Sequence, residues 1–571
     1  MTAVEDQRSA ELRGIARAGT ISLIGSAASA VLGFALVVQV SRGLGTAGAG
    51  AFSVVVAVAM TLAVAGRFGT DTALVRMAPR LRALGRTRDI DAAAVAALVP
   101  VFAGTTLLAV LAWWAAPHLV GVVFEHPAPP GAVWLIRVAV ATVPLGATGY
   151  VALAVTRGLG SVVPLTVVES IAKPALRCAF VGIAMAAAHR AWPHADLTAG
   201  PVLWTTVAWA IPQLIGGLWA AALAHRALAA ARHAGSSVDS VAGAAPATAL
   251  GLGAPASGAT TTSGAAPASG AAPASGAAAT WRELWGFAAP RAAASACEIA
   301  GMHSGIILVS ALAGVADAGV YNAALRLALA GTLALQALRL AIAPTLARLL
   351  TVGDLDGVEH LHRTASVWIT VVSFPLYLVF AAWPTEVLRL FGPGFQAGGT
   401  ALAILATATL VNLATGPVST LLLMSGRSTL TFAVTAASLT FSIVLALVLI
   451  PRYGVAGAAI AKGAAVVGEN IAVTVVVRRS VGVRTLSRPL VHAALAGVLC
   501  FVVPAVVYQL FAGHDFPAAV LVVLLGTAAY LALLWRHRDE FSLADLAAAL
   551  PLDRLRLRRP RPGPRPSKEN R

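Results

Sequence analysis

Residues 18–40 read AGTISLIGSAASAVLGFALVVQV, a run of 23 residues without a charged side chain. The hydrocarbon core of a bilayer is about 30 Å thick, and a helix needs about 20 apolar residues to cross it. The run therefore predicts a membrane-spanning helix. It is longer than the apolar segment of a cleaved signal peptide, which has about 7–15 residues, and similar runs follow it.

Thirteen more apolar windows of this length follow, each bounded by Arg, Gly, Pro or Asp. Together they predict an all-α polytopic membrane protein with 14 transmembrane helices. The predicted spans are residues 18–40, 48–66, 92–114, 132–154, 164–187, 201–224, 288–312, 320–342, 364–383, 400–424, 430–450, 455–477, 489–511 and 517–535.

The composition of all 571 residues agrees with a lipid environment, because 58% are hydrophobic and only 11% are charged. Soluble domains carry about 25% charged residues. The net charge of +17 would suit nucleic acid, but no polar domain exists to bind it, and nucleic acid is excluded as a partner. The three cysteines stand singly in apolar stretches, without the spacing of a disulfide framework or a zinc site. We expect no cofactor and no metal.

Lys and Arg are unevenly distributed between the segments that join the predicted spans. If the N-terminus is cytoplasmic, thirty basic residues lie in cytoplasmic segments, and four, Arg42, Arg190, Arg389 and Arg452, lie in external loops. Positive residues accumulate on the cytoplasmic side of membrane proteins. We therefore expect a multi-pass protein with both termini in the cytoplasm.

An Ala-, Gly-, Ser- and Pro-rich tract, in which residues 263–268 and 269–274 both read SGAAPA, is typical of a flexible linker. The tail after the last span is basic, which suits the anionic cytoplasmic leaflet or serves only to enforce topology. The expected organisation is a cytoplasmic N-terminus at 1–17, an N-lobe of helices 1–6 at 18–224, a low-complexity cytoplasmic linker at 225–283, a C-lobe of helices 7–12 at 284–480, helices 13 and 14 at 481–535, and a basic cytoplasmic tail at 536–571.

The chain also contains an internal repeat. Residues 45–52, GTAGAGAF, and 314–321, GVADAGVY, share Gly, Ala, Ala, Gly and a closing aromatic residue at an offset of 269. Residues 78–81, APRL, and 343–346, APTL, match at the corresponding later place. We predict a duplicated six-helix unit. Because six is even, both copies would have the same orientation, which is the parallel-repeat design of several secondary transporters, with the substrate site between the halves.

Ten charged residues lie within the predicted spans, and each charge at the bilayer centre costs roughly 2.5–3.5 kcal/mol. This number predicts a polar interior. The residues are Arg137, Lys173, Arg177, Arg291, Arg326, Arg339 and Lys462, with Glu169, Glu298 and Glu469.

Glu169, Lys173 and Arg177 follow one another at intervals of four, so they share one face of the fifth predicted helix. The surplus cation suits an anionic substrate, and Arg binds phosphate oxygens in a bidentate manner. The alternative is a Glu169–Lys173 pair that only neutralises itself. Arg291 and Arg326, near span ends, either join the substrate site or extend to the membrane interface.

Arg291 and Glu298, like Lys462 and Glu469, are seven residues apart. This spacing places each pair on one helix face, but about 10 Å apart along the axis, too far for a direct ion pair. A protonatable carboxyl in a transporter core is a candidate ion-coupling group, so Glu298, Glu469 and Glu169 are the candidates. The alternative is a buried neutral or paired carboxyl that fixes helix packing.

The sequence contains no G-x-x-x-x-G-K-[ST] motif, so it carries no recognisable ATP-hydrolysing module. The longest predicted external loop, at about 115–131, is too short for a catalytic domain. We expect a secondary transporter and not an enzyme.

Several short motifs follow one another in order along residues 12–480. They are SRGLG at 41–45 with GAF at 50–52, LWGFAAP at 284–290, AGVY at 318–321, LFGPGF at 390–395, SGR at 425–427 and IPRYGVAGA at 450–458. In this order they resemble the bacterial polysaccharide flippases of the Wzx type, in the superfamily that also holds lipid II flippases and multidrug antiporters.

The resemblance implies a two-lobed bundle in the bacterial cytoplasmic membrane that moves an undecaprenyl-pyrophosphate-linked oligosaccharide to the outer leaflet by alternating access. It implies membrane lipids, H⁺ or Na⁺ as coupling ion, and glycan assembly enzymes as partners. Met302 and His303 stand where many relatives have an acidic residue, which argues against ion coupling through the seventh span. A lipid II flippase is one alternative. A cation-coupled multidrug antiporter is another, although it should have an acidic cavity and the charges within the spans sum to +4.

Overall fold

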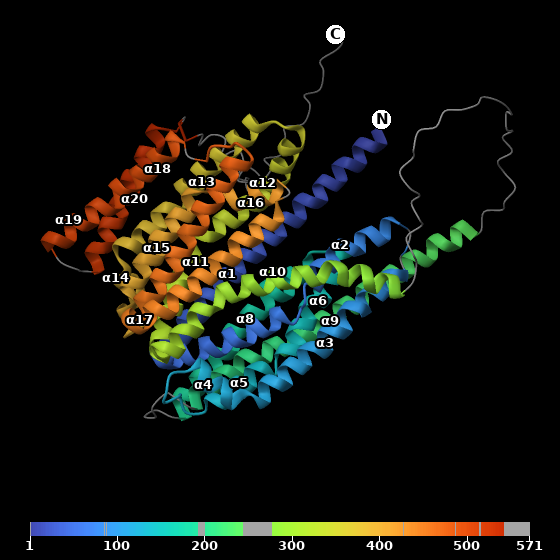
Figure 1. The fold of residues 1–571 in the computed structure, drawn as a ribbon, viewed down its shortest axis with the longest axis horizontal. Helices are drawn as coiled ribbons and strands as arrows, with labels where there is room; N and C mark the ends of the chain where they lie inside the picture. The colour runs from blue at the N-terminus through green and yellow to red at the C-terminus, as the bar shows by residue number, and fades with distance from the viewer. Residues whose placement is uncertain are drawn as a thin grey trace, which may run out of the picture. The chain divides into compact units, whose positions relative to one another are not determined.

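The computed structural model describes residues 2–541, except 85, 87, 192–199, 244–276, 426, 486, 513–515 and 539. Every regular element in these residues is a helix (Figure 1). The centre of the predicted linker and nearly all of the predicted basic tail lie outside the described residues.

Internal contacts divide the chain into two compact units. Unit 1 consists of Met1–Leu333, Pro384–Ala408 and Thr429–Glu469, and unit 2 of Ala334–Trp383, Thr409–Ser428 and Asn470–Arg571. All seven predicted site residues belong to unit 1.

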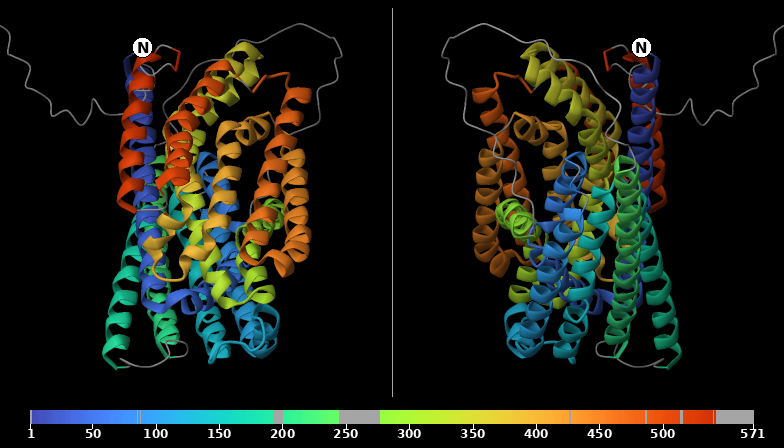
Figure 2. Two further views of the ribbon diagram at one scale, coloured as in Figure 1. Left: turned by 90° about the vertical axis from the view of Figure 1, so that its left-hand side faces the viewer. Right: turned by 90° about the vertical axis from the view of Figure 1, so that its right-hand side faces the viewer.

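The helices that precede the predicted linker lie in unit 1. They are α1 (Thr2–Ala65), α2 (Thr70–Ala83), α3 (Arg88–Trp114), α4 (Ala116–Val123), α5 (Ala132–Val140), α6 (Val143–Gly158), α7 (Val163–Leu165), the π-helix η1 (Thr166–Ala172), α8 (Lys173–Ala191) and α9 (Gly200–Gly243). The helices α8 and α9 run side by side (Figure 2).

The helices that follow the predicted linker are divided between the units. They are α10 (Ala277–Leu312), α11 (Val315–Ala330), α12 (Thr332–Val352), α13 (Leu355–Ala382), α14 (Pro384–Leu388), η2 (Arg389–Phe391), η3 (Phe395–Gly398), α15 (Gly399–Ala414), α16 (Val418–Met424), α17 (Ser428–Ser480), α18 (Arg488–Gly497), the π-helix η4 (Val498–Val502), α19 (Val503–Ala512) and α20 (Phe516–Arg536).

Among the described residues, 11 helices are long and apolar enough to cross a membrane. Two of them, Ile24–Arg82 and Thr429–Ser480, each contain two of the predicted spans. The predicted span 320–342 is divided between α11 and α12 at Gly331. The predicted span 400–424 is interrupted between α15 and α16. Every predicted span therefore lies largely on helical structure, whereas the total of fourteen crossings stays a prediction.

Both ends of the predicted linker are helical, because residues 225–243 continue α9 and residues 277–283 begin α10. Residues 227–231 read ALAAA, and Ala and Leu are strong helix formers that extend a helix beyond its apolar span. The two helices therefore extend beyond the predicted spans, and the linker boundaries of 225 and 283 stay a prediction.

Single glycines join consecutive helices at three places. Gly45 interrupts α1 with φ +65°, Gly454 interrupts α17 with φ +53°, and Gly314 precedes α11 with φ +102°. Glycine adopts such left-handed backbone without steric cost. Gly45 and Gly314 occupy equivalent positions of the predicted repeat, since their numbers differ by its offset of 269.

The contact between α1 and α11 also pairs equivalent positions. A Cβ on Gly50 would lie 1.8 Å from a carbonyl oxygen of α11, and a Cβ on Gly319 would lie 2.2 Å from a carbonyl oxygen of α1. One turn further on, the Asn322 side-chain amide donates a hydrogen bond to the Ser53 hydroxyl at 2.8 Å. Only glycine permits this backbone approach, so the two helices cross at residues that share the offset of 269.

Both π-helices end two residues before a proline. Lys173 and Pro174 follow η1, and Val503 and Pro504 follow η4. Proline has no N–H to donate within a helix, and its ring clashes with the carbonyl group four residues earlier. The wider turn of a π-helix accommodates both effects, and such turns often occur at functional sites.

Unit 2 packs α18, η4, α19 and α20 against α13. The Gln509 amide donates a hydrogen bond to the Ala382 carbonyl oxygen at 2.7 Å, and the Tyr530 hydroxyl donates one to the Val371 carbonyl oxygen at 3.3 Å. The turn between α15 and α16 also approaches α13, because a Cβ on Gly416 would lie 2.1 Å from the Ser366 hydroxyl oxygen. The Gln509 and Tyr530 side chains of the last two predicted spans thus donate their hydrogen bonds to backbone oxygens, as polar groups in an apolar solvent must.

Candidate functional site

The predicted polar column of the fifth span is assembled at the junction of η1 and α8. The Lys173 ammonium donates a hydrogen bond to the Glu169 carboxylate at 2.7 Å, and Lys173 is only 3% exposed. Its aliphatic stem lies against α9, where a Cβ on Gly216 would be 2.5 Å from the Lys173 Cδ atom. The ammonium group is therefore both paired and covered in this conformation.

Arg177, one turn further along α8, faces α9 as well. Its guanidinium donates a hydrogen bond to the Gln213 side-chain oxygen at 2.5 Å and lies 4.8 Å from the centre of the Trp209 ring. The Arg177 Nε atom is buried and has no hydrogen-bond partner. Gly146 leaves the space that Gln213 occupies, since a Cβ there would lie 2.2 Å from the Gln213 amide nitrogen. Among the described residues, Arg177 thus has polar and aromatic contacts but no carboxylate within ion-pair distance.

Arg67 directly follows the predicted span 48–66 and was not among the predicted site residues. The helix breaks after Ala65 and resumes at Thr70, with φ of +51° at Phe68 and +70° at Gly69. At the break, the Arg67 guanidinium lies 3.8 Å from the centre of the Tyr150 ring. An arginine beside two glycines at the end of an apolar run is the sequence signal for this break.

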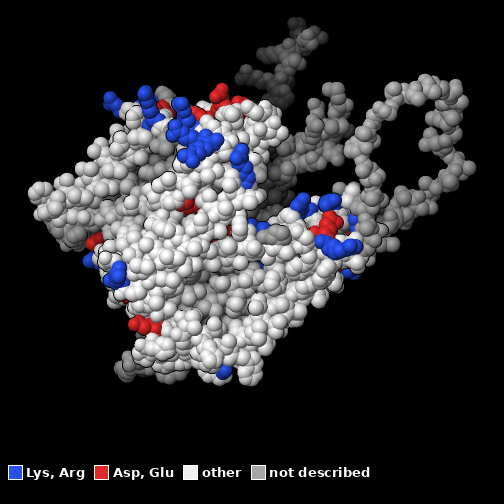
Figure 3. All heavy atoms as spheres, viewed as in Figure 1, with Lys and Arg blue, Asp and Glu red and all other residues white. Residues whose placement is uncertain are grey.

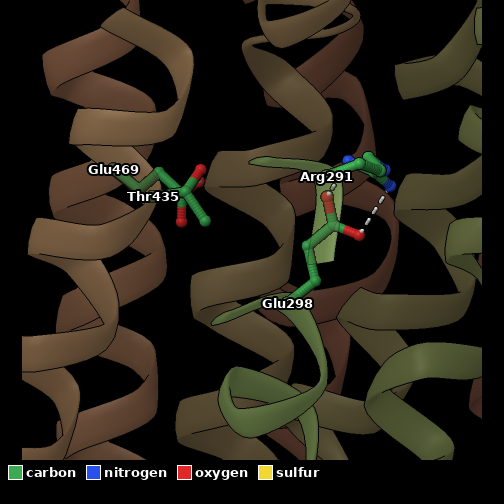
Figure 4. A network of polar contacts seen from close by, with 4 residues as sticks. All are labelled: Arg291, Glu298, Thr435 and Glu469. Carbon is green, nitrogen blue, oxygen red and sulfur yellow. Dashed lines mark hydrogen bonds and ion pairs between the residues drawn. The ribbon is translucent and has the colours of Figure 1, made fainter. Parts of the chain in front are cut away.

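Arg291 and Glu298 form an ion pair, contrary to the expectation that their axial separation is too large. The Arg291 Nη1 and Glu298 Oε1 atoms are 3.3 Å apart (Figure 4). Both side chains are long enough to extend along α10 and close the gap of two helical turns. They are 37% and 58% exposed, respectively, so this pair is accessible to a ligand.

Lys462 and Glu469 bind different groups, in agreement with their spacing. The Thr435 hydroxyl donates a hydrogen bond to the Glu469 carboxylate at 3.1 Å, and the Lys462 ammonium donates one to the Gly301 carbonyl oxygen at 3.0 Å. Figure 4 shows Glu469 and Thr435, which belong to the parts of α17 after and before Gly454, and the Arg291–Glu298 ion pair of α10 in the same view.

Arg326 and His303 lie near each other in the second half of the chain. Arg326 is exposed, and its charge acts on His303. Among the described residues, Arg326 has no ion pair and no hydrogen bond. His303 is 8% exposed, and its Nδ1 atom has no hydrogen-bond partner, as expected of a residue within the packed interior.

The charges of unit 1 do not cancel. Its described ion pairs join Lys173 with Glu169 and Arg291 with Glu298 inside the predicted spans. Further cations at or within these spans have no carboxylate in ion-pair contact among the described residues. They are Arg67, Arg177, Arg326 and Lys462, and Arg137 is a fifth, held by the Trp113 carbonyl oxygen and the rings of Trp113 and Trp134.

No family model matches the sequence, and no curated protein matches it. A solved structure of the lipid II flippase MurJ in an inward closed conformation is similar, with a TM-score of 0.64 at 12% identity over 91% of this chain and 99% of that chain. An inward-facing MATE family multidrug resistance transporter of the MOP superfamily gives 0.57 at 13% identity over 83% and 95%. The MATE multidrug transporter DinF-BH gives 0.51 at 15% identity over 83% and 97%. The chain therefore has the fold that a lipid II flippase shares with multidrug transporters.

Proposed function

We propose that this protein is a secondary transporter that moves an undecaprenyl-pyrophosphate-linked oligosaccharide across the bacterial cytoplasmic membrane by alternating access. The fold supports a transporter, because the similar solved structures are a flippase and multidrug transporters. The finer assignment of substrate rests on the charges of unit 1.

The observation that carries the proposal is the cationic surplus inside the predicted spans. Among the residues that the structure describes, Arg177, Arg326 and Lys462 within the spans and Arg67 beside them have no carboxylate in ion-pair contact, so the site attracts an anion. An uncompensated charge in a membrane is costly, and a pyrophosphate neutralises several cations at once. A cationic drug would meet electrostatic repulsion in the same site, which disfavours multidrug antiport.

Exposure suggests an order in which the cations act. Arg291 and Arg326 are accessible in this conformation, whereas Lys173 is covered by α9 and Arg177 is held by Gln213. The pyrophosphate would first contact Arg291 and Arg326. Lys173 and Arg177 would reach it after α8 and α9 rearrange during the transport cycle.

The Arg291–Glu298 pair offers a route to ion coupling. A pyrophosphate that binds Arg291 would take the partner of Glu298 away from it. The Glu298 carboxylate would then be available to a coupling ion when the substrate is bound. Glu469, held by the Thr435 hydroxyl, and Glu169, held by Lys173, are further candidates for ion coupling.

A lipid II flippase is the second candidate. The similarity to MurJ covers 91% of this chain, compared with 83% for the two MATE transporters. Both candidates predict a polyprenyl-pyrophosphate substrate, and they differ in the group attached to it. Only lipid II carries the peptide of the peptidoglycan precursor.

The experiment is mass spectrometry of lipids that copurify with the full-length protein. Wild type should retain a polyprenyl-pyrophosphate glycan, and both Arg326→Ala and Lys173→Ala/Arg177→Ala should lose most of it. Arg452→Ala, which removes an exposed cation outside the site, is the matched control and should retain the lipid. A glycan without a peptide supports the oligosaccharide, and a peptide supports lipid II. Absence of polyprenyl-pyrophosphate from wild type would refute the proposal.

A further inference from the structure

Unit 2 contains a polar cavity of about 500 Å³ at the start of α13 and α18. Its lining includes His360 and Arg363 of α13, Arg488 of α18, and Glu540 and Phe541, which follow α20. Lys and Arg gather at this end of unit 2, over the elements labelled α12, α13 and α18 in Figure 1 (Figure 3). The predicted topology assigns this end to the cytoplasm.

The acidic groups around this cavity already have partners. Glu359 binds the Arg363 guanidinium and accepts a hydrogen bond from the Arg484 backbone N–H at 2.9 Å. The Glu540 carboxylate lies 2.5 Å from the His492 Nδ1 atom. Arg488, in contrast, is exposed and has no ion pair and no hydrogen bond among the described residues.

The basic side chains of the cavity retain capacity for an anion. The Arg363 Nε atom is buried without a hydrogen-bond partner. Arg488 begins α18, a helix of 10 residues whose N-terminal end carries partial positive charge. With both carboxylates engaged, the cavity attracts a group such as a phosphate.

A second, apolar cavity of about 490 Å³ lies between α18–α19 and α20. Leu495, Leu499 and Val503 line it, and these side chains are 59%, 60% and 45% exposed. They belong to the predicted span 489–511, so their exposed surface faces the depth of the bilayer. A row of exposed apolar side chains in a concave wall suits an acyl chain.

The two cavities meet at Glu540 and Phe541, which line both of them. Phe541 is 4% exposed, and the Glu540 contact with His492 fixes this junction to α18. A basic cavity at the membrane surface therefore continues into an apolar groove in the membrane. This combination is complementary to an amphiphile with an anionic head.

We propose that this paired site binds an anionic phospholipid of the cytoplasmic leaflet, with its phosphate at Arg363 and Arg488 and an acyl chain along Leu495, Leu499 and Val503. The basic character of the cavity favours an anionic head over a zwitterionic one. The proposal does not depend on the transported substrate, because every residue of this site belongs to unit 2 and every candidate substrate residue to unit 1.

The test uses full-length protein in detergent and counts bound lipid by native mass spectrometry, with dioleoyl-phosphatidylglycerol or dioleoyl-phosphatidylcholine as the added probe. Wild type should bind phosphatidylglycerol in preference to phosphatidylcholine. Arg363→Gln/Arg488→Gln should lower phosphatidylglycerol affinity at least tenfold. Arg488→Gln alone, which breaks no ion pair, should lower it severalfold and guards against misfolding of the double variant.

Two further variants separate the site from general charge attraction. Leu499→Trp fills the groove and should lower phosphatidylglycerol binding with the basic residues intact. Arg478→Gln/Arg479→Gln removes two exposed charges of unit 2 outside both cavities and should leave binding unchanged. Equal losses in this control and in the double pocket variant would overturn the proposal, as would unchanged binding in Arg488→Gln and Leu499→Trp. Recovery of a polyprenyl-pyrophosphate glycan, and not phosphatidylglycerol, from this site would overturn it too.

Discussion

Substitution of Gly319 by alanine tests the close crossing of α1 and α11. The new Cβ would lie 2.2 Å from the Thr46 carbonyl oxygen and 2.9 Å from the Gly50 nitrogen. Relief of this overlap requires the helices to separate by about 1 Å, and such overpacking costs about 1–3 kcal/mol. We therefore expect Gly319→Ala to lower the thermal unfolding temperature and to reduce transport.

The matched control is Gly33→Ala on α1, where a Cβ would meet nothing within 4 Å. Both substitutions bring the helix propensity of alanine, which is about 1 kcal/mol more favourable than that of glycine. The difference in stability between the two variants therefore measures the cost of disturbing the crossing of α1 and α11. Thermal unfolding in detergent is the primary assay, with transport in cells as the second. Gly50→Ala/Gly319→Ala should cost less than the sum of the single variants, because the first substitution already separates the helices. Equal stability of Gly319→Ala and Gly33→Ala would refute the reasoning.

Three other predictions concern separate parts of the fold. Glu169→Gln leaves the buried Lys173 ammonium without its carboxylate. The loss of unfolding free energy should be about 3–5 kcal/mol, reduced because the pair is partly exposed, and Lys173→Met in the same chain should recover most of it. A thermal unfolding temperature of Glu169→Gln equal to that of wild type would contradict this prediction. Gly416→Ala combines a φ of +65° with the contact to α13 described above and should be destabilising by about 2 kcal/mol or more, again measured by thermal unfolding. Burial, together with the nearby Glu125 carboxylate, raises the pKa of Asp317, which precedes the predicted span 320–342. Folding therefore favours the protonated carboxyl, so the contribution of Asp317 to stability is present at low pH and is lost as the pH rises through the folded-state pKa. Asp317→Asn should flatten the dependence of the thermal unfolding temperature on pH.

The helical segments were predictable because each apolar run has the length of a bilayer crossing. The predicted end of the second span at residue 66 coincides with the break at Gly66–Gly69. The geometry of the break was not predictable, because it depends on packing against a distant helix. A Cβ on Gly69 would lie 2.6 Å from the Ala288 carbonyl oxygen of α10. The direction in which the chain continues after the break thus depends on a tertiary contact that local sequence does not contain.

The candidate site was predictable in its residue types and only partly in its geometry. The interval of four brought Glu169 and Lys173 into contact even though η1 has the wider turn of a π-helix. The prediction that Arg291 and Glu298 are too far apart for an ion pair used only the axial distance between their backbone positions. It was wrong because the two long side chains extend toward each other. The partners of Arg177 come from α9 and required the fold itself.

The reciprocal approach of Gly50 and Gly319 bears on the history of this chain. Two positions that share the repeat offset touch each other, so each surface meets its own counterpart. That is the rule of an isologous homodimer with two-fold symmetry. An ancestral six-helix protein that associated with a second copy through this glycine would have used the same surface twice. Fusion of two such genes would have converted the dimer interface into an internal crossing, and afterwards the two glycines could diverge only together.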